Sequence, residues 1–404
     1  MNETAETPRR RRWAFSLRTL MIFVLIVGGL LGWKANRASR QRQAAAIIRT
    51  ANGAISYDFQ SFPNGTPAAT RKAAKPPGPE WLRKWIGDEY FQEISGVSFP
   101  GEVSTQVLEA VASLEQLRVI RINKPLSNSQ ELLPLTALPH LEIVDLCGPA
   151  VDDTLMKHLS LSQSIIVIET HETNVTDKGV NYLPKMPNLK HLSIYNSPKV
   201  TDASVEEVIS RLTKLTDLDL SGTSVTDTGI EAIGKMTNLT SLSVNDLDLT
   251  DRSTISLTRL IKLRLLFLDR TKITDEGLSR LGALTELIQI SLRQTQIQGS
   301  GFANLQNLQK IIALRLEGSN FSDEGMQHLS RLKALQEIRL SRTWVSDVGL
   351  ASLQGLPRLR SLTMVSTQVT DAGMDAFRAA NPRVRQAINK PVGRPSPPSS
   401  QVRP

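Results

Sequence analysis

Apolar residues recur along most of this chain in the pattern L-x-x-L-x-L, and the positions between them are largely polar. The short alternating segment predicts a strand, and the apolar positions three and four apart that follow it predict a helix. A fixed period of 20–29 residues is typical of a solenoid whose units pack only on their neighbours. The period is 24 residues, with one interval of 26, and the first apolar position falls at Leu117, Leu141, Ile165, Leu189, Leu215, Leu239, Leu263, Leu287, Ile311, Leu335 and Leu359.

With a degenerate first unit at Ile94 (ISGVSF), this makes about twelve strand–helix units over residues 94–383. We therefore expect an α/β fold, a horseshoe-shaped solenoid. Counting the first apolar position as offset 0, the residues at offsets 0, 3 and 5 should point inward and form the core. Among them Leu242, Leu266 and Leu314, all at offset 3, should be fully buried.

Two polar positions of the repeat have structural explanations. Offset 8 carries a hydroxyl in most units, which can hydrogen-bond to backbone groups. The Thr-Asp or Ser-Asp pair that follows should cap the helix and place a negative charge at its positive end. Catalytic carboxylates are the alternative for these Asp residues, but one Asp per repeat favours the structural role. The offset 8 hydroxyls belong to Thr173, Ser197, Thr223, Thr271, Thr295, Ser319, Thr343 and Thr367.

Three motifs point to a known family. Residues 225–230 read V-T-D-T-G-I, residues 15–20 read FSLRTL, and residues 76–91 read PPGPEWLRKWIGDEYF. On these motifs and the period, the chain resembles leucine-rich-repeat proteins of the ribonuclease-inhibitor-like and cysteine-containing type, specifically the bacterial membrane-anchored ones. The resemblance covers nearly the whole chain. It implies the solenoid fold and a membrane anchor, and it says almost nothing about the ligand.

The segment Trp13–Trp33 predicts a transmembrane helix (residues 13–33) behind a basic N-terminal tail (residues 1–12). Its only charge is Arg18, and 21 residues of helix span about 30 Å, the thickness of the hydrocarbon core. A buried core helix and a cleaved signal peptide are the alternatives. The following KANRASRQRQ offers no small-residue cleavage site, so we expect an uncleaved signal anchor in the cytoplasmic (inner) membrane. Arginines before the span favour a cytoplasmic N-terminus and extracytoplasmic repeats.

Residues 34–93 should form a linker and an N-terminal cap. Residues 34–50 favour a helix, residues 54–59 a short strand, and the Pro- and Gly-rich residues 61–79 a loop. The helical spacing of Trp81, Leu82, Trp85 and Ile86 has two interpretations, a ligand-stacking site or a cap over the open end of the solenoid. We favour the cap, because terminal repeats need one. Residues 384–404 should be a disordered, Pro-rich tail.

The net charge of +9 comes from the ends of the chain. Residues 1–50 and 384–404 carry net charges of +8 and +4, whereas residues 93–383 carry 29 basic and 33 acidic residues, a net charge of −4. A nucleic-acid-binding protein concentrates basic residues on its folded surface, so we expect no nucleic-acid partner. The single cysteine, Cys147, excludes an intramolecular disulfide.

Nothing in the chain matches a catalytic or cofactor motif. Phosphate loop, zinc spacing, nucleophile elbow and G-x-G-x-x-G are all missing from the sequence. His171 lies in sequence near Glu169 and Glu172, and one unit after Asp145, but without a metal-ligand spacing these read as solvated polar residues. We expect no enzyme activity, no cofactor and no metal.

The concave face should carry the binding site, because solenoids bind there. Offsets 2, 4, 6 and 7 face it, and their charge changes sign along the chain. The acidic half holds Asp145, Glu169, Glu172, Asp217, Asp219 and Asp246; the other half holds Phe267, Arg270, Arg293, Arg315, Arg339 and Arg342, the candidate partner-binding residues.

We expect Arg293, Arg315 and Arg339 to form a ladder on successive strands, about 4.8 Å apart. Such a ladder suits an acidic protein segment or an anionic polysaccharide. The alternative is that Glu317 and Glu337 already neutralise these arginines. The predicted function is a membrane-tethered recognition module for a partner; the alternative is an inhibitor or regulator of a secreted or periplasmic enzyme.

Overall fold

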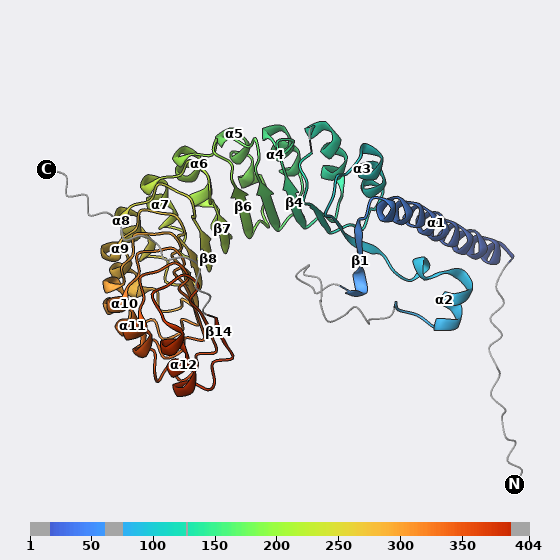
Figure 1. Cartoon of the computed structure of the whole chain (residues 1–404). Helices are drawn as coiled ribbons and strands as arrows, with labels where there is room; N and C mark the ends of the chain where they lie inside the picture. The colour runs from blue at the N-terminus through green and yellow to red at the C-terminus, as the bar shows by residue number, and fades with distance from the viewer. Residues whose placement is uncertain (1–16, 61–75, 127, 389–404) are drawn as a thin grey trace, which may run out of the picture.

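The computed structural model describes residues 17–60, 76–126 and 128–388. The predicted tail 1–12, the start of the predicted anchor at 13–16, most of the predicted loop and the predicted tail from residue 389 therefore lie outside the described residues. Within them, a single curved sheet lines the inside of an arch and helices cover its outside (Figure 1). This is the predicted α/β solenoid.

The sheet has 14 strands in chain order. β1 pairs antiparallel with β2, and every later neighbour pair is parallel, so β2 to β13 begin the twelve predicted units. β14 extends the sheet to Ile388, beyond the boundary we expected at residue 383. The strands are β1 Ala54–Tyr57, β2 Ile94–Phe99, β3 Val119–Ile122, β4 Ile143–Cys147, β5 Val167–His171, β6 His191–Tyr195, β7 Asp217–Asp219, β8 Ser241–Ser243, β9 Leu265–Phe267, β10 Gln289–Ser291, β11 Ala313–Arg315, β12 Glu337–Arg339, β13 Ser361–Thr363 and β14 Gln386–Ile388.

Short helices return the chain over the outer surface. Two units replace the α-helix by 3₁₀ segments, η3 (Ser129–Ala137) and η7 (Ser300–Asn304), and η4 (Leu183–Lys185), η5 (Ile209–Arg211) and η6 (Leu281–Ala283) follow α-helices. The outer α-helices are α3 Thr105–Ala112, α4 Asp153–Leu159, α5 Asp177–Val180, α6 Asp202–Glu207, α7 Asp227–Ile233, α8 Asp251–Leu257, α9 Asp275–Arg280, α10 Asp323–Leu329, α11 Asp347–Ala351 and α12 Asp371–Ala380.

The core follows the predicted offsets. Leu242, Leu266 and Leu314 are each 0 % exposed, which confirms the assigned register. Buried side chains form one continuous cluster from Ala44 to Phe377. Each unit therefore buries its apolar face against the next one, as a solenoid requires.

The V-T-D-x-G signature forms hydrogen bonds that join consecutive repeats, and we call this set of bonds the clamp. Asp202 is the first residue of α6, and its carboxylate accepts hydrogen bonds from the backbone N and Oγ1 of Thr226 in the next repeat, at 2.8 and 2.6 Å. The backbone N of Gly229 donates to the same carboxylate at 3.0 Å, and a Cβ on Gly229 would overlap it. The same Asp-to-hydroxyl pairing joins Asp153 to Thr176, Asp177 to Thr201, Asp227 to Thr250, Asp251 to Thr274, Asp323 to Ser346 and Asp347 to Thr370.

A left-handed residue ends the concave stretch of most units. At offset 7, Arg270 and Arg342 have φ of 55° and 58°, and Gly222 in the same position has φ of 68°. From Thr223 onward, the hydroxyl at offset 8 donates to the carbonyl three residues earlier, as Thr271 does to Leu268 at 2.8 Å, whereas the hydroxyl of Thr173 bonds to that of Ser197. This confirms the predicted hydroxyl–backbone bond.

A single helix, α1 (Leu17–Thr50), joins the apolar segment to the solenoid. Its second half buries Ala38, Gln41, Ala44, Ala45 and Ile48. Gln41 donates through Nε2 to the carbonyl of Gln92 at 2.9 Å and accepts from the backbone N of Ile94 at 3.2 Å. The second half of α1 therefore caps the open end of the solenoid.

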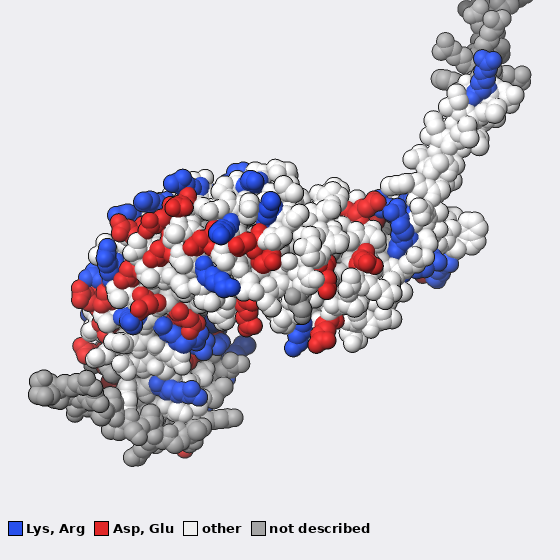
Figure 2. All heavy atoms as spheres, turned by 90° about the horizontal axis from the view of Figure 1, so that it is seen from above, with Lys and Arg blue, Asp and Glu red and all other residues white. Residues whose placement is uncertain are grey.

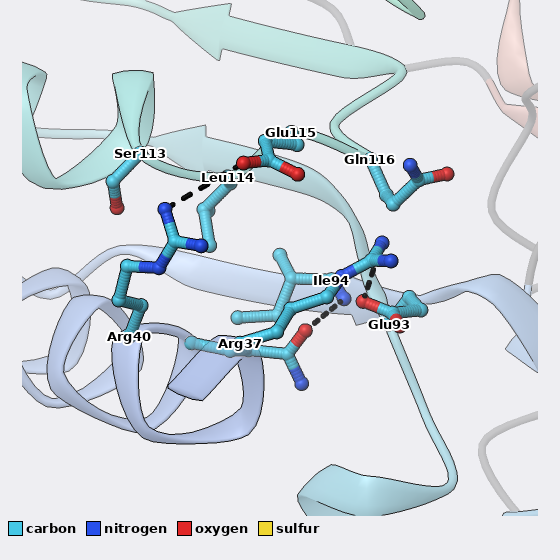
Figure 3. Close-up of a pocket in the computed structure, with 9 residues that line it drawn as sticks. Arg37, Arg40, Glu93, Ile94, Ser113, Leu114, Glu115 and Gln116 are labelled. Carbon is cyan, nitrogen blue, oxygen red and sulfur yellow. Dashed lines mark hydrogen bonds and ion pairs between the residues drawn. The ribbon is translucent and has the colours of Figure 1, made fainter. Parts of the chain in front are cut away.

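Ion pairs reinforce this cap. Arg37 contacts Glu93 at 3.2 Å and Arg40 contacts Glu115 at 3.5 Å (Figure 3). The prediction that the tryptophan segment forms the cap is wrong. α2 (Glu80–Ile86) buries none of its residues, and Trp81 and Trp85 are 70 % and 80 % exposed.

Candidate functional site

The candidate site is the concave surface of the sheet, where side chains alternate between core and solvent. In β7, β8, β9, β11, β12 and β13 the middle residue is buried and its two neighbours are partly exposed. The neighbours at offset 4 are direct partners from strand to strand, and we call them the central row. It consists of Arg121, Asp145, Glu169, Ser193, Asp219, Ser243, Phe267, Ser291, Arg315, Arg339 and Thr363.

The acidic half of the central row borders a shallow hollow. Its volume is about 320 Å³, and Glu169, His171, His191, Asp217 and Asp219 line it together with three serines and Leu218. In the part of the chain that the structure describes, Asp217 and Asp219 have no ion-pair partner. This half therefore presents unbalanced negative charge.

Two histidines lie beside carboxylates of this half. His171 Nε2 lies 3.3 Å from Asp145 Oδ1, and His191 Nε2 lies 3.5 Å from Glu169 Oε1. The hydrogen bond to Asp145 raises the pKa of His171, against the opposing effect of burial. As the pH rises through this raised pKa, the stabilisation from the protonated His171 is lost and the hollow becomes more negative.

The predicted three-arginine ladder has the wrong register. Arg315 and Arg339 are direct partners on β11 and β12, but the residue opposite Arg315 on the other side is Ser291. Arg293 lies at offset 6, two residues beyond Ser291, where β10 ends. It lies 3.9 Å from both Asp269 and Glu317.

Acidic side chains pair with several of these arginines, and the pairs of Arg293 with Glu317 and of Arg339 with Glu337 are those that the alternative expected. Arg339 Nε donates to Glu337 Oε1 at 2.5 Å, and Arg270 forms a two-point ion pair with Asp246. Asp246 and Arg270 both lie at offset 7 of consecutive units, and this shared offset brings their side chains together.

Arg315 and Arg342 differ from the other arginines of the concave face in their ion pairing. Within the described ranges, Arg315 Nε is buried without a hydrogen-bond partner, and neither residue forms an ion pair. Burial raises the pKa of Glu317 although Arg293, Arg339 and Arg315 act in the opposite direction. Phe267 lies half-buried between the acidic and basic halves. The concave surface is therefore dipolar, with an aromatic side chain near its middle.

The described residues were also considered as ligands for a metal ion, and Cys147 as a thiol. Among residues 17–60, 76–126 and 128–388, no group of three or more His, Cys, Asp or Glu side chains is placed to hold a metal ion. Cys147 is half-buried, and burial raises the pKa of its thiol.

The first half of α1 forms a second candidate surface. By length and composition α1 is long and apolar enough to cross a membrane, and none of its most apolar stretch is buried. Figure 2 shows it leaving the body as an uncharged rod, with basic residues near its outer end and at its base. A signal sequence passes the same test of length and composition.

Comparisons with known proteins agree with this architecture. Residues 211–234 match the leucine-rich-repeat family model. An internalin from Listeria monocytogenes aligns over 87 % of this chain and 95 % of its own, with 18 % identity and a TM-score of 0.54. A chain of the yeast Rad7–Elc1 complex aligns over 94 % of both chains, with 17 % identity and a TM-score of 0.56. No curated protein matches the sequence. The fold is therefore a leucine-rich-repeat solenoid, and one stretch of the chain, residues 211–234, matches the model of that family.

Proposed function

We propose that this chain is a membrane-tethered recognition module that binds a protein partner along its concave face. The uneven charge of the concave face carries the proposal. Arg121 begins the central row and pairs with Asp145, but Glu169 and Asp219 follow in the same half. Arg315 lies in the other half, beside Arg339, which pairs with Glu337. Complementary charge gives a partner both orientation and specificity. The eight strand steps from Asp145 to Arg339 cover about 38 Å, the length of an extended segment of about twelve residues.

A protein segment fits this surface better than an anionic polysaccharide does. Asp217 and Asp219 would repel a uniformly negative chain, whereas a polypeptide can present basic residues to the acidic half and acidic residues to Arg315 and Arg342. The yeast neighbour is itself part of a two-protein complex. A partner that is a secreted or periplasmic enzyme would make this chain its inhibitor or regulator.

The tether is the exposed first half of α1. Its apolar side chains include Leu25, at 72 % exposed, and Leu31, at 64 %. Burying such surface in a bilayer is favourable in proportion to its area. The arginines that precede the span favour a bacterial inner-membrane orientation with extracytoplasmic repeats.

Charge reversal in the acidic half tests the binding face. We expect D217K/D219K to weaken capture of the partner at least about tenfold, because like charges facing each other across an interface cost several kcal/mol. The measurement is affinity capture from detergent-solubilised membranes, with quantitative mass spectrometry of the proteins retained by each variant.

The matched control is E206K/E207K, which makes the same change in charge on the exposed end of α6. It should retain the partner at the wild-type level. Equal loss in both variants, or retention in both, would contradict recognition by the acidic half, provided that both variants unfold at the wild-type temperature.

A further inference from the structure

α2 exposes two tryptophans on one face. Trp81 and Trp85 are four residues apart, so their side chains are neighbours on the helix surface. They are 70 % and 80 % exposed, the helix buries none of its residues, and Lys84 beside them pairs with Glu80 at 3.0 Å. Neither the core nor the cap of the solenoid uses this aromatic surface.

The structure fixes α2 next to the point where the apolar half of α1 ends. Arg83 contacts Asp88 at 3.0 Å, which ties α2 to the 3₁₀ turn η2 (Asp88–Tyr90). Glu89 of this turn forms an ion pair with Arg42 of α1. The next residue after the turn, Phe91, has its ring centroid 6.0 Å from Lys34 Nζ.

These contacts place α2 at a defined level along α1. Lys34 directly follows Trp33, the last residue of the apolar stretch. Arg42 lies only about 12 Å beyond Lys34 along the helix axis. In Figure 1, α2 lies below α1 and away from the repeats. A bilayer that accommodates the apolar half of α1 would therefore have its polar boundary close to α2.

Tryptophan suits that boundary, because its ring is apolar and its indole N–H needs a polar partner. We propose that α2 lies in the headgroup region of the bilayer that α1 spans and inserts Trp81 and Trp85 into it. This inference rests on the proposed tether. Because α1 continues from the apolar half into the cap as one helix, a second contact through α2 would fix the orientation of the solenoid relative to the membrane.

Quenching by brominated lipids tests the contact in the full-length protein. The chain has five tryptophans. The variant W13F/W33F/W344F keeps Trp81 and Trp85, W81F/W85F/W344F keeps the two anchor tryptophans, and W13F/W33F/W81F/W85F keeps Trp344 on a distant repeat. Each is reconstituted into phosphatidylcholine–phosphatidylglycerol vesicles with and without lipid brominated near the headgroup.

We expect the brominated lipid to reduce the fluorescence of the Trp81/Trp85 variant by a fraction similar to that of the anchor variant, and to leave Trp344 unchanged. Quenching of the anchor tryptophans without quenching of Trp81 and Trp85 overturns the inference and leaves the tether intact. No quenching in either variant overturns both. A blue shift of Trp81 and Trp85 without bromine quenching assigns this surface to a second copy of the chain instead, and also overturns the inference.

Discussion

Replacing Asp202 by alanine should lower the free energy of unfolding of the solenoid by about 1.5–3 kcal/mol, the range for hydrogen bonds to a charged group. The carboxylate accepts three hydrogen bonds from the following repeat, two from Thr226 and one from Gly229. Alanine leaves the backbone N–H groups of Thr226 and Gly229 without their acceptor. Thermal or denaturant unfolding of the purified protein measures the change.

Asp371 provides the matched control. It occupies the same first position of α12, but no described repeat with the clamp follows it, and its side chain is exposed. Asp371→Ala therefore removes the favourable charge at the helix N-terminus without removing a clamp, and should cost less than about 1 kcal/mol. Equal destabilisation by the two substitutions would show that the clamp contributes nothing beyond the helix charge.

Two aspartates in the apolar half of α1 should release the protein from the membrane. V24D/L25D places two charges near the centre of the expected span, and each costs roughly 2.5–3.5 kcal/mol for insertion. Val24 and Leu25 are 60 % and 72 % exposed, so the repeats should fold as before. Alkaline extraction of membranes should recover the wild type in the pellet and the variant in the soluble fraction.

The swap V24L/L25V keeps the composition and should remain in the pellet. A variant that stays with the membrane as firmly as the wild type would contradict the anchor. A wild-type protein that begins after residue 33 would instead identify a cleaved signal peptide. Protease added to intact spheroplasts should digest the repeats if their orientation is as proposed.

The repeat register could be predicted from the sequence because each core position recurs every 24 residues. The clamp could not be predicted in this way, although the sequence contains a sign of it. Gly229 follows Asp227 by two residues, and the same Asp-x-Gly spacing recurs in other units. Its explanation lies in the carboxylate of the preceding repeat, which a pattern within one unit does not show. The left-handed turn at offset 7 was also only partly predictable. Gly222 and Gly318 indicate it, but Arg270 and Arg342 adopt the same positive φ despite their Cβ atoms.

The charge polarity of the concave face was predictable, but its detailed pairing was not. Grouping all outward positions together placed Arg293 with Arg315, although they differ by two offsets and only Arg315 faces Arg339. The cap was missed for another reason. The change of composition at Lys34 indicates two separate units, one ending at Trp33 and one over residues 34–50, but helix propensity continues across Lys34 and α1 does not end there.

Site-specific photo-cross-linking tests most directly whether the partner lies on the concave face. Benzoylphenylalanine replaces Phe267 at the middle of the central row in one protein, and Ile255, 54 % exposed on the outer helix α8, in another. Irradiation of intact membranes followed by purification and mass spectrometry identifies the adducts. Concave-face recognition predicts a partner adduct from position 267 and none from position 255. An adduct from position 255 with none from position 267 would contradict it.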